Sequence, residues 1–272
     1  MPELPEVEST CRGIRDVLLN QKILSVHIRE SRLRWPISPN LAIEIKNSTV
    51  LSIERRAKYI LIITNKGTLI IHLGMSGRLQ VAPLTSPARK HDHIDFIFAH
   101  SLCLRFNDTR RFGSVLWTTH AALQHPLLIN LGVEPLSTAF TGDYLFTHAR
   151  QSKTLIKKSI MNHFIVVGIG NIYANEALFY AGILPTRLSN SLSLAECKKL
   201  VAASKKILRY AIKRGGTTLR DFLSPGGEKG YFALELAVYG KALETCIQCN
   251  NTLSEVLYIN QRATVYCSYC QH

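Results

Sequence analysis

A secondary amine and two carboxylates stand at the start of the chain. Met1 precedes Pro2, a small residue that an aminopeptidase can uncover, and Glu3 and Glu6 follow. A terminal α-amino group titrates near pH ~8, so an uncovered Pro2 is a nucleophile without deep burial. A secondary amine that attacks a sugar C1′ gives an iminium, which has no N–H to lose and acts as an electron sink. The structural alternative is that Pro5 opens a helix and the glutamates favour its positive end. On their own, these residues favour that alternative.

Four cysteines near the C-terminus have the spacing of a metal site. Two C-x2-C knuckles are separated by 17 residues and contain Cys246, Cys249, Cys267 and Cys270. Four thiolates complete a tetrahedral shell and leave no position for water, so we expect one structural Zn²⁺. We expect the knuckles to carry a β-hairpin whose loop holds Gln261 and Arg262. The alternative is a zinc-free cluster of buried thiols.

The glycine-rich segment 167–173 has the look of a phosphate-binding loop. Tyr173 replaces the third glycine of a dinucleotide fingerprint, and no βαβ unit surrounds the segment. Glycines that lead into a helix starting with Asn171 would instead present free backbone N–H groups to a phosphate. A glycine turn between helices with an asparagine cap explains the same residues nearly as well.

Cations and two apolar residues recur in the turns of the first half. The cations are Arg55, Arg56, Lys58, His72, Lys90, His91, Arg110 and Arg111. Each of them alone is interpreted as surface charge. Met75 and Phe112 lie in glycine-rich turns, where an apolar side chain can wedge between bases when one is extruded. Core packing is the alternative, and without further context it is the preferred interpretation of both.

The composition favours a globular protein that binds a polyanion. The 272 residues include 33 Lys+Arg against 19 Asp+Glu, a formal net charge of +14, and the excess grows toward the C-terminus. A solvated basic surface is the alternative. The seven cysteines fit a reducing compartment, and Cys11, Cys103 and Cys197 are interpreted as core thiols. The acidic N-terminus lacks an apolar signal, and no apolar run approaches ~20 residues, so we expect a soluble cytoplasmic protein. We also expect a monomer.

The periodicity changes from strand-like to helical along the chain. Apolar Val7, Cys11, Ile14, Val17 and Leu18 predict one amphipathic helix from Pro5. Short β-prone runs follow, and they predict half-buried antiparallel strands in a β-sandwich or open barrel over roughly residues 20–120. The predicted strands are 23–28, 50–53, 59–64, 68–73 and the runs around 94–98 and 102–106.

Helical signals dominate the second half. Residues 131–144 are rich in turn formers and are interpreted as the linker between domains. Ser193 and Glu196 form a capping box that predicts a helix, which Gly215 and Gly216 end.

Together these residues resemble a known family. The matching segments, in family order, are MPELPEVE (1–8), RRAKY (55–59), HLGMSG (72–77), KHDH (90–93), RRFG (110–113), GIGNIYANEALF (168–179), GYF (230–232), VYG (238–240), QRAT (261–264) and the four cysteines. They run the full length and resemble formamidopyrimidine-DNA glycosylase.

The resemblance implies an α+β multidomain fold. An N-terminal β-sandwich with an N-terminal helix would occupy residues 1–131, a helix–two-turn–helix DNA-binding domain 132–236, and a Cys₄ zinc finger on a β-hairpin 237–272. It also implies a bifunctional DNA glycosylase/AP lyase. Such an enzyme excises 8-oxoguanine and formamidopyrimidines from double-stranded DNA, then cleaves the strand by β- and δ-elimination.

The resemblance also implies roles for single residues. Pro2 would be the Schiff-base nucleophile, Glu3 the proton donor to the opening sugar, and Glu6 the residue that orients the amine. Lys58 would serve β-elimination, and Arg262 the δ-step. The implied DNA contacts are the space-filling residues Met75, Arg110 and Phe112, and the phosphate-binding residues His72, His91, Arg111, Lys153, Asn171 and Tyr239. The loop 223–231, with Arg220 before it, would close over the everted lesion.

Some positions depart from the family pattern. Thr109 stands where proline commonly precedes the paired arginines, and Asn162-His163 replaces the usual Asp-Gln. The loop between the cysteine knuckles starts with Asn250-Asn251 and is one residue longer than common. Two rivals remain at this point. One is an endonuclease VIII-like enzyme for oxidised pyrimidines, against which Leu4 and the complete Met75/Arg110/Phe112 set argue. The other is a non-catalytic zinc-ribbon DNA-binding protein.

Overall fold

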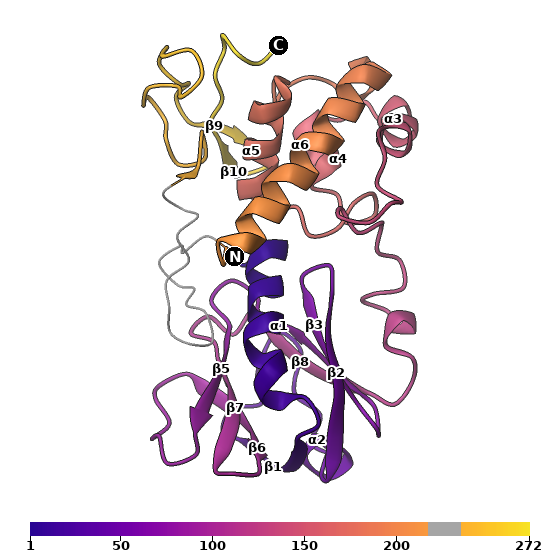
Figure 1. Ribbon diagram of the computed structural model, residues 1–272, viewed down its shortest axis with the longest axis vertical. Coiled ribbons are helices and arrows are strands. Elements are labelled where there is room, and N and C mark those ends of the chain that lie inside the picture. The colour runs from indigo at the N-terminus through magenta and orange to yellow at the C-terminus, as the bar shows by residue number, and fades with distance from the viewer. Residues whose placement is uncertain (217–234) are drawn as a thin grey trace. The chain divides into compact units, whose positions relative to one another are not determined.

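The computed structural model describes residues 1–216 and 235–272 (Figure 1). The chain divides into two compact units, which are described separately. The first contains Met1–Ile129 and the described residues 214–216; the second contains Asn130–Lys213 and the described residues 235–272. The predicted lesion-capping loop 223–231 and Arg220 lie outside the described residues.

An eight-stranded antiparallel sheet forms most of the first unit. Its strands are β1 (Lys22–Ile28), β2 (Ser48–Arg56), β3 (Tyr59–Thr64), β4 (Thr68–His72), β5 (Arg78–Pro83), β6 (Asp92–Phe98), β7 (Leu102–Asn107) and β8 (Ser114–Thr118). They follow the order β5-β7-β6-β1-β2-β3-β4-β8, and the middle pair β1–β2 meets over only two residue pairs. The sheet is therefore two four-stranded halves with a short junction.

One hydrophobic cluster joins the two halves. It takes Phe96 and Phe106 from one half and Ile62 and Ile71 from the other, together with Val7 of the N-terminal helix. The halves thus pack across a shared core, which confirms the predicted β-sandwich. Two short helical segments, α2 (Leu41–Glu44) and η1 (Ala122–Gln124), complete the unit.

The N-terminal helix α1 (Leu4–Leu18) packs along β2. Cys11, Ile14 and Leu18 are fully buried, whereas Val17 is 40% exposed, so its predicted place on the buried face is wrong. The apolar stripe advances through positions 7, 11, 14 and 18 and turns residue 17 outward. Arg15 fastens the helix to the sheet, because its guanidinium donates to the Ile53 carbonyl at 2.8 and 3.1 Å.

Strand β6 is buried on both faces, so the predicted half-burial is wrong. Its polar residue Asp95 is only 1% exposed because two arginines neutralise it. Arg105 donates to Asp95 at 2.8 and 2.9 Å and Arg29 at 2.5 Å, and these hydrogen bonds lower the pKa of Asp95 against its burial. A buried carboxylate is tolerated when it is paired in this way.

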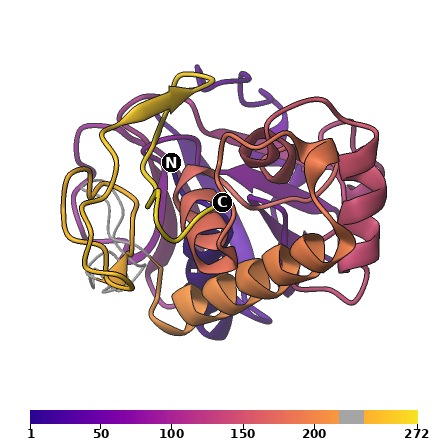
Figure 2. The same cartoon turned by 90° about the horizontal axis from the view of Figure 1, so that it is seen from above.

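Helices and a small hairpin form the second unit (Figures 1 and 2). The helices are α3 (Gly142–Arg150), α4 (Ile156–Ile160), α5 (Asn171–Ala181), η2 (Ser189–Ser191) and α6 (Leu194–Lys213), and the hairpin pairs β9 (Leu257–Ile259) with β10 (Arg262–Thr264). Helix α6 packs on both α5 and α3. Two successive turns connect α4 to α5: Asn162 N–H donates to Ser159 O, and Ile165 N–H donates to Asn162 O. This confirms the helix–two-turn–helix arrangement.

The predicted linker 131–144 is not a free connection. Gly132 N–H donates to His163 O at 2.8 Å, Val133 bridges Val166, and Phe140 is fully buried. The segment therefore belongs to the core of the second unit. Its turn-forming composition does not reveal these partners, which lie about thirty residues away. Among the described residues, no helix has the length and apolarity that spanning a membrane requires.

The predicted capping box opens α6. Ser193 N–H donates to a Glu196 carboxylate oxygen at 2.7 Å, and Glu196 N–H donates to Ser193 Oγ at 3.2 Å. Arg187 also pairs with Glu196, and this hydrogen-bonded pair lowers the pKa of Glu196 to about 2. The carboxylate therefore stabilises the fold above its unfolded pKa near 4.5, and the contribution disappears as pH falls from about 4.5 to about 2.

We expect Glu196→Gln to lower the free energy of unfolding by about 1 kcal/mol at neutral pH, because a capping box and a partly exposed ion pair are both lost. The loss relative to the unsubstituted protein should shrink steadily as the pH falls from about 4.5 toward 2. Urea unfolding followed between pH 2.5 and 7 measures both effects. Glu255→Gln, which removes an exposed carboxylate from the same unit, is the control. Equal curves for the two variants would contradict the assignment.

Candidate functional site

The N-terminal residues that could do chemistry are buried. Pro2 and the side chains of Glu3 and Glu6 are shielded, with Glu3 only 3% and Glu6 2% exposed. Glu3 caps α1, and its N–H donates to Glu6 Oε2 at 2.8 Å. The glutamates therefore have the helix-capping role that the structural alternative predicted. This role does not exclude chemistry, because it fixes both carboxylates beside Pro2.

Gly216 lies against Glu6, which sequence reasoning did not predict. Its φ is +84°, and a Cβ built there would stand 3.0 Å from Glu6 Oε1. A side chain at this position would therefore press on the carboxylate. In the sequence, the glycine pair indicates only the end of a helix.

Lys58 lies in the two-residue turn between β2 and β3. Arg55 braces this turn, since its Nη1 donates to the Ala57 carbonyl at 3.0 Å and its Nε donates to Glu8 Oε2 at 3.1 Å. Glu8 belongs to α1, so the lysine turn is tied directly to the helix that begins next to Pro2. A short hairpin loop of this kind, held at its base, keeps an amine in a defined place.

His72 is a neutral hydrogen-bond donor close to Lys58. Burial, followed by the charges of Lys58 and Arg34, lowers the pKa of His72 to about 4. Gly74 N–H donates to His72 Nδ1 at 2.9 Å, so Nε2 carries the proton of the neutral ring. The structure thus brings two of the predicted residues together and leaves His72 with an N–H that suits an anionic oxygen.

The interpretation of Met75 and Phe112 as core residues is wrong. Met75 is 36% exposed and Phe112 is 49% exposed. The Arg110 guanidinium lies over the Phe112 ring at 4.9 Å from its centroid. Two exposed apolar side chains and an arginine therefore project from neighbouring turns, which is an arrangement suited to displacing a base.

Two more predicted residues lie near these turns, and one lies in the other unit. Arg111 is exposed and its Nη1 donates to Glu30 Oε2 at 3.2 Å. His91 is half-buried at φ +75°, and its ring lies 6.2 Å from that of His93. Lys153 is exposed on the segment between α3 and α4.

Asn171 and Arg262 are connected within the second unit. Asn171 is the first residue of α5, and its Nδ2 donates to the Ala263 carbonyl at 3.0 Å. Arg262, the residue before Ala263, is exposed and opens β10. The predicted place of Arg262 in the hairpin loop is therefore wrong by one residue. Asn260 and Gln261, both at positive φ, form the two-residue turn.

Tyr239 is positioned by a buried carboxylate that sequence reasoning missed. Glu176 of α5 is 0% exposed and accepts backbone N–H bonds from Ala237, Val238 and Tyr239 at 2.8 to 3.0 Å. Desolvation nevertheless raises the pKa of Glu176. No local pattern reveals this contact, because the partners are more than sixty residues apart in the chain.

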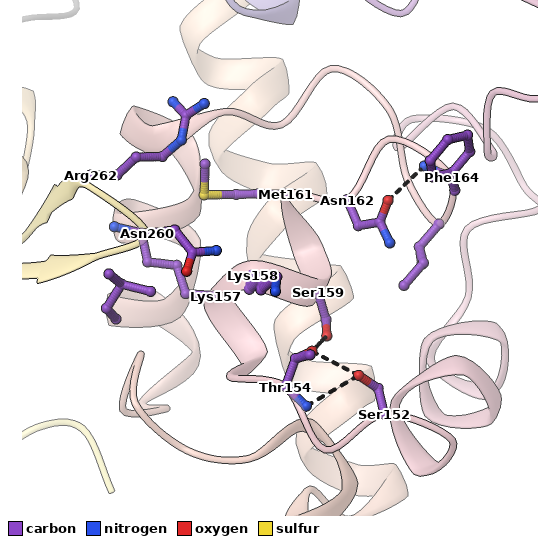
Figure 3. Close-up of a pocket in the computed structure, with 12 residues that line it drawn as sticks. Ser152, Thr154, Lys157, Lys158, Ser159, Met161, Asn162, Phe164, Asn260 and Arg262 are labelled. Carbon is purple, nitrogen blue, oxygen red and sulfur yellow. Dashed lines mark hydrogen bonds between the residues drawn. The ribbon is translucent and has the colours of Figure 1, made fainter.

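A basic cavity of about 430 Å³ lies beside Arg262 (Figure 3). Lys157, Lys158 and Arg262 line it, and no carboxylate is among its described lining residues. Lys157 is buried, and its Nζ donates to Thr264 Oγ1 at 2.7 Å and to Ala263 O at 3.3 Å. This lysine therefore fixes the strand that presents Arg262.

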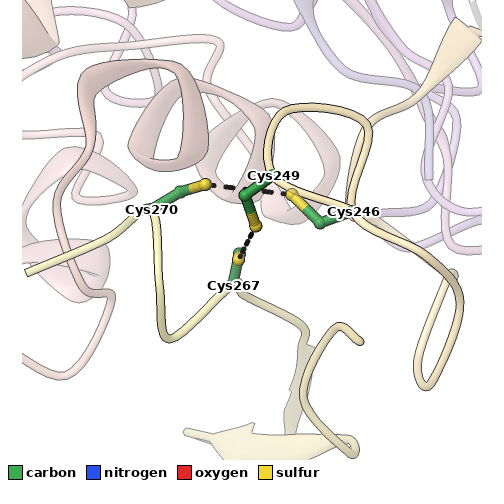
Figure 4. Close-up of side chains that lie close together, drawn as sticks. All are labelled: Cys246, Cys249, Cys267 and Cys270. Atoms are coloured by element: carbon green, nitrogen blue, oxygen red, sulfur yellow. Dashed lines mark hydrogen bonds between the residues drawn. The ribbon is translucent and has the colours of Figure 1, made fainter. Parts of the chain in front are cut away.

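The four cysteines of the two knuckles converge on one point (Figure 4). All four Sγ atoms lie within 4.8 Å of one another, with 3.9 Å between Cys246 and Cys270 and 3.5 Å between Cys249 and Cys267. Tetrahedral zinc with Zn–S bonds of ~2.3 Å requires sulfur atoms ~3.8 Å apart, whereas a disulfide requires ~2.05 Å. The thiols therefore fit a metal ion, as predicted, and not a pair of disulfides.

Comparison with known proteins identifies the family of the chain. The sequence model of the formamidopyrimidine-DNA glycosylase N-terminal domain matches residues 1–115, and that of the formamidopyrimidine-DNA glycosylase H2TH domain matches residues 131–223. The formamidopyrimidine-DNA glycosylase of Hydrogenovibrio crunogenus is 52% identical over 271 residues, which cover 100% of this chain and 96% of the relative. That of Nitrosococcus oceani is 50% identical over 272 residues and 100% of both chains.

Solved structures show the same relationship. The MutM (Fpg) protein of Thermus thermophilus has a TM-score of 0.89 and 32% identity, covering 99% of this chain and 98% of its own. A Lactococcus lactis Fpg variant in complex with Fapy-dG-containing DNA has a TM-score of 0.92 and 32% identity over 100% of both chains. The chain therefore belongs to the formamidopyrimidine-DNA glycosylase family, and it is a DNA glycosylase with AP-lyase activity.

Proposed function

We propose that this enzyme excises oxidised purines, 8-oxoguanine and formamidopyrimidines, from duplex DNA and then cleaves the strand by β- and δ-elimination. The observation that carries the proposal is the exposed set Met75, Arg110 and Phe112 on adjoining turns. Excision requires that a paired base leave the stack at a cost of a few kcal/mol, and such a set fills the space that the base vacates. The Lactococcus lactis relatives bound to Fapy-dG DNA and to abasic-site DNA support the same substrates.

In the proposed chemistry, an uncovered Pro2 nitrogen attacks C1′ of the everted nucleotide. The N-glycosidic bond breaks and its electron pair leaves with the base, which takes up a proton. Glu3 donates a proton to the ring oxygen as the sugar opens, and the amine loses its proton to give the iminium. Glu6, fixed by the Glu3 N–H, orients the amine. The iminium stabilises the carbanion character that develops when C2′ loses its proton.

Elimination then needs two cationic side chains. Lys58 serves the β-step, in which the C2′ proton is removed and the C3′–O bond breaks. In the δ-step the C4′ proton is removed and the C5′–O bond breaks, and Arg262 holds the phosphate that leaves. Water releases the sugar fragment from the amine. The braced turn that holds Lys58 and the anchored strand that presents Arg262 support these roles, because both cations occupy defined positions.

The remaining predicted residues would hold DNA phosphates. His72 would donate from Nε2 as a neutral ring, and Arg111, His91, Lys153, Asn171 and Tyr239 would add charge or N–H and O–H donors. Arg110 would read the cytosine opposite the lesion. A net charge of +14 supplies the sequence-independent attraction, which should weaken steeply with salt.

One structural Zn²⁺ held by the four cysteines would fix the knuckles that flank β9 and β10, so its chemistry is to cross-link the finger and not to react. The proposed domain boundaries are 1–131, 132–236 and 237–272. The proposed form is a monomer in the cytoplasm, together with the nucleoid DNA.

Borohydride trapping tests the function. Zinc-loaded protein incubated with an 8-oxoguanine:cytosine duplex should give a covalent adduct under borohydride and a nicked strand without it. A thymine glycol duplex in the same assay distinguishes an endonuclease VIII-like enzyme, which would prefer the pyrimidine lesion. If the protein binds the duplex but gives neither an adduct nor a nick, the result would favour the alternative hypothesis of a non-catalytic zinc-ribbon DNA-binding protein.

A further inference from the structure

A buried carboxylate joins the two turns that carry Met75, Arg110 and Phe112. Asp108 follows β7 and is 0% exposed. The Ser76 hydroxyl donates to Asp108 Oδ1 at 2.6 Å, and Gly113 N–H donates to Oδ2 at 2.8 Å. One side chain therefore bonds the turn after β4 and the turn before β8.

Ser76 makes a second hydrogen bond between the two turns, this time to the backbone of Arg110. Arg110 N–H lies 3.1 Å from Ser76 Oγ and 3.3 Å from Asp108 Oδ1, so it donates into the same pair of acceptors. The backbone that presents Arg110 thus depends on a hydroxyl in the turn that presents Met75.

Asp108 also contacts a third segment, residues 91–93, through its backbone. Asp108 N–H donates to the His91 carbonyl at 3.1 Å, and a His93 ring nitrogen lies 2.7 Å from the Asp108 carbonyl. His91 is one of the predicted phosphate contacts. Asp108 is therefore a hub for three segments that the proposed function places against DNA.

The two turns also touch through their backbones. Gly74, at φ +62°, has no room for a side chain, because a Cβ there would stand 2.4 Å from Gly113 N and from the Phe112 carbonyl carbon. A Cβ on Gly113 would stand 2.8 Å from His72 O and 3.0 Å from Asp108 Oδ2. The backbones of the two turns are therefore packed in direct contact, so one turn cannot shift without displacing the other.

We infer that Asp108, through Ser76, is a positioning residue that locks both turns into a single rigid wedge for base displacement. The inference rests on the proposed function. Three side chains that enter a duplex from separate mobile turns would each lose conformational freedom on insertion. A hub that fixes them beforehand removes that cost, so more of the binding energy is available to offset the free-energy cost of unstacking the base.

Ser76→Ala and Ser114→Ala form a matched pair for the test. Both remove one buried hydroxyl within this part of the first unit, but the Ser114 hydroxyl has no hydrogen-bond partner among the described residues. Single-turnover excision from an 8-oxoguanine:cytosine duplex should slow about tenfold in Ser76→Ala and stay within about twofold in Ser114→Ala, since one buried hydrogen bond is worth about that factor.

Two further readouts separate positioning from general damage. Cleavage of an abasic site in a single-stranded oligonucleotide, which needs no base displaced, should be unchanged in both variants. The rise in fluorescence of a 2-aminopurine beside the lesion should be delayed only in Ser76→Ala, and the preference for cytosine over adenine opposite the lesion should fall with it. Asp108→Asn should show the same pattern more strongly. Asp95→Asn, which removes a buried carboxylate from the same sheet, should leave the opposite-base preference intact.

The outcomes distinguish the two claims. If the unsubstituted protein neither forms an adduct nor excises the base, the proposed function is wrong. The inferred positioning role of Asp108, which rests on that function, is then wrong as well. If the unsubstituted protein is active but Ser76→Ala matches Ser114→Ala, the hub alone is wrong. An equal slowing of duplex excision and single-strand cleavage also overturns the hub, because it shows a general loss of activity.

Discussion

Insertion of a glutamine between Met1 and Pro2 is expected to abolish borohydride trapping and to reduce base excision at least about 1000-fold, the scale on which loss of a covalent nucleophile acts. An aminopeptidase removes Met1 only when a small residue follows, so the insertion leaves Pro2 inside the chain. Its nitrogen is then an amide nitrogen with no basic electron pair and cannot attack C1′.

Pro2→Gly is the matched control for this insertion. Glycine is also small, so Met1 is removed and a primary amine takes the place of the secondary one. An imine can still form and be trapped, although it can lose its proton and is a weaker electron sink. We expect an adduct with slower strand cleavage. Intact mass shows which N-terminus each protein carries, and binding to an undamaged duplex shows that the fold persists.

An adduct with the insertion variant would contradict the assignment of Pro2. The nucleophile would then be the retained Met1 α-amine or a lysine, and Lys58 is the candidate lysine because its turn is tied to α1 through Arg55 and Glu8. Lys58→Ala in the insertion background decides this point. Loss of the adduct in that double variant would show that Lys58, in the β2–β3 turn, forms the Schiff base instead of the N-terminus.

The sequence predicted those parts of the fold whose signal is local. Strand β3 has the predicted bounds 59–64, and the box of Ser193 and Glu196 opens α6, because alternation and capping depend on residues a few positions apart. The cysteine spacing predicted the thiol cluster for the same reason. Strands β5 and β8 were missed, since their pairing with β7 and β4, which are distant in sequence, leaves no local signal.

The unpredicted part of the site depends on contacts between distant segments. Asp108 meets Ser76 across 32 positions, and Glu176 meets Ala237 across 61. Nothing in either neighbourhood distinguishes a buried acid with partners from an exposed one. The exposure of Phe112 is also a tertiary property, because an apolar residue in a glycine-rich turn is compatible with core or surface. The role of Phe112 follows from the family resemblance and not from local pattern, whereas Asp108 and Glu176 had no predicted role.

The second large effect is expected from loss of the metal. Strands β9 and β10 pair over only three residues, and a two-stranded hairpin is marginal in water. The cluster beneath the knuckles is small, with Phe179, Val238, Leu253 and Val265 among its members. Zinc binding in comparable fingers contributes on the order of 10 kcal/mol, which no burial in so small a cluster replaces. We therefore expect a bound ion to be needed, in addition to the Lys157 hydrogen bonds, to order the strand that presents Arg262.

We expect Cys249→Ala to lose the zinc equivalent and to reduce δ-elimination at least about 100-fold, because displaced Arg262 no longer holds its phosphate. Cys249 is the suitable target, since it is only half-buried, whereas Cys246 and Cys267 also pack in the core. Cys197→Ala, which removes a buried thiol from α6 in the same unit, should keep one zinc and near-normal cleavage.

Metal analysis and nicking of an abasic-site duplex measure these outcomes. Removal of zinc with a chelator should have the same effect as Cys249→Ala, and adding zinc back should restore cleavage. Adduct formation at Pro2 should be less affected than δ-elimination, because Pro2, Glu3 and Lys58 belong to the first unit, which contains none of the four ligands. Products should therefore shift from a β,δ-cleaved strand toward a β-cleaved one. Cys249→Ala protein that keeps a full zinc equivalent, or zinc-free protein that completes both eliminations, would show that the finger does not depend on the ion.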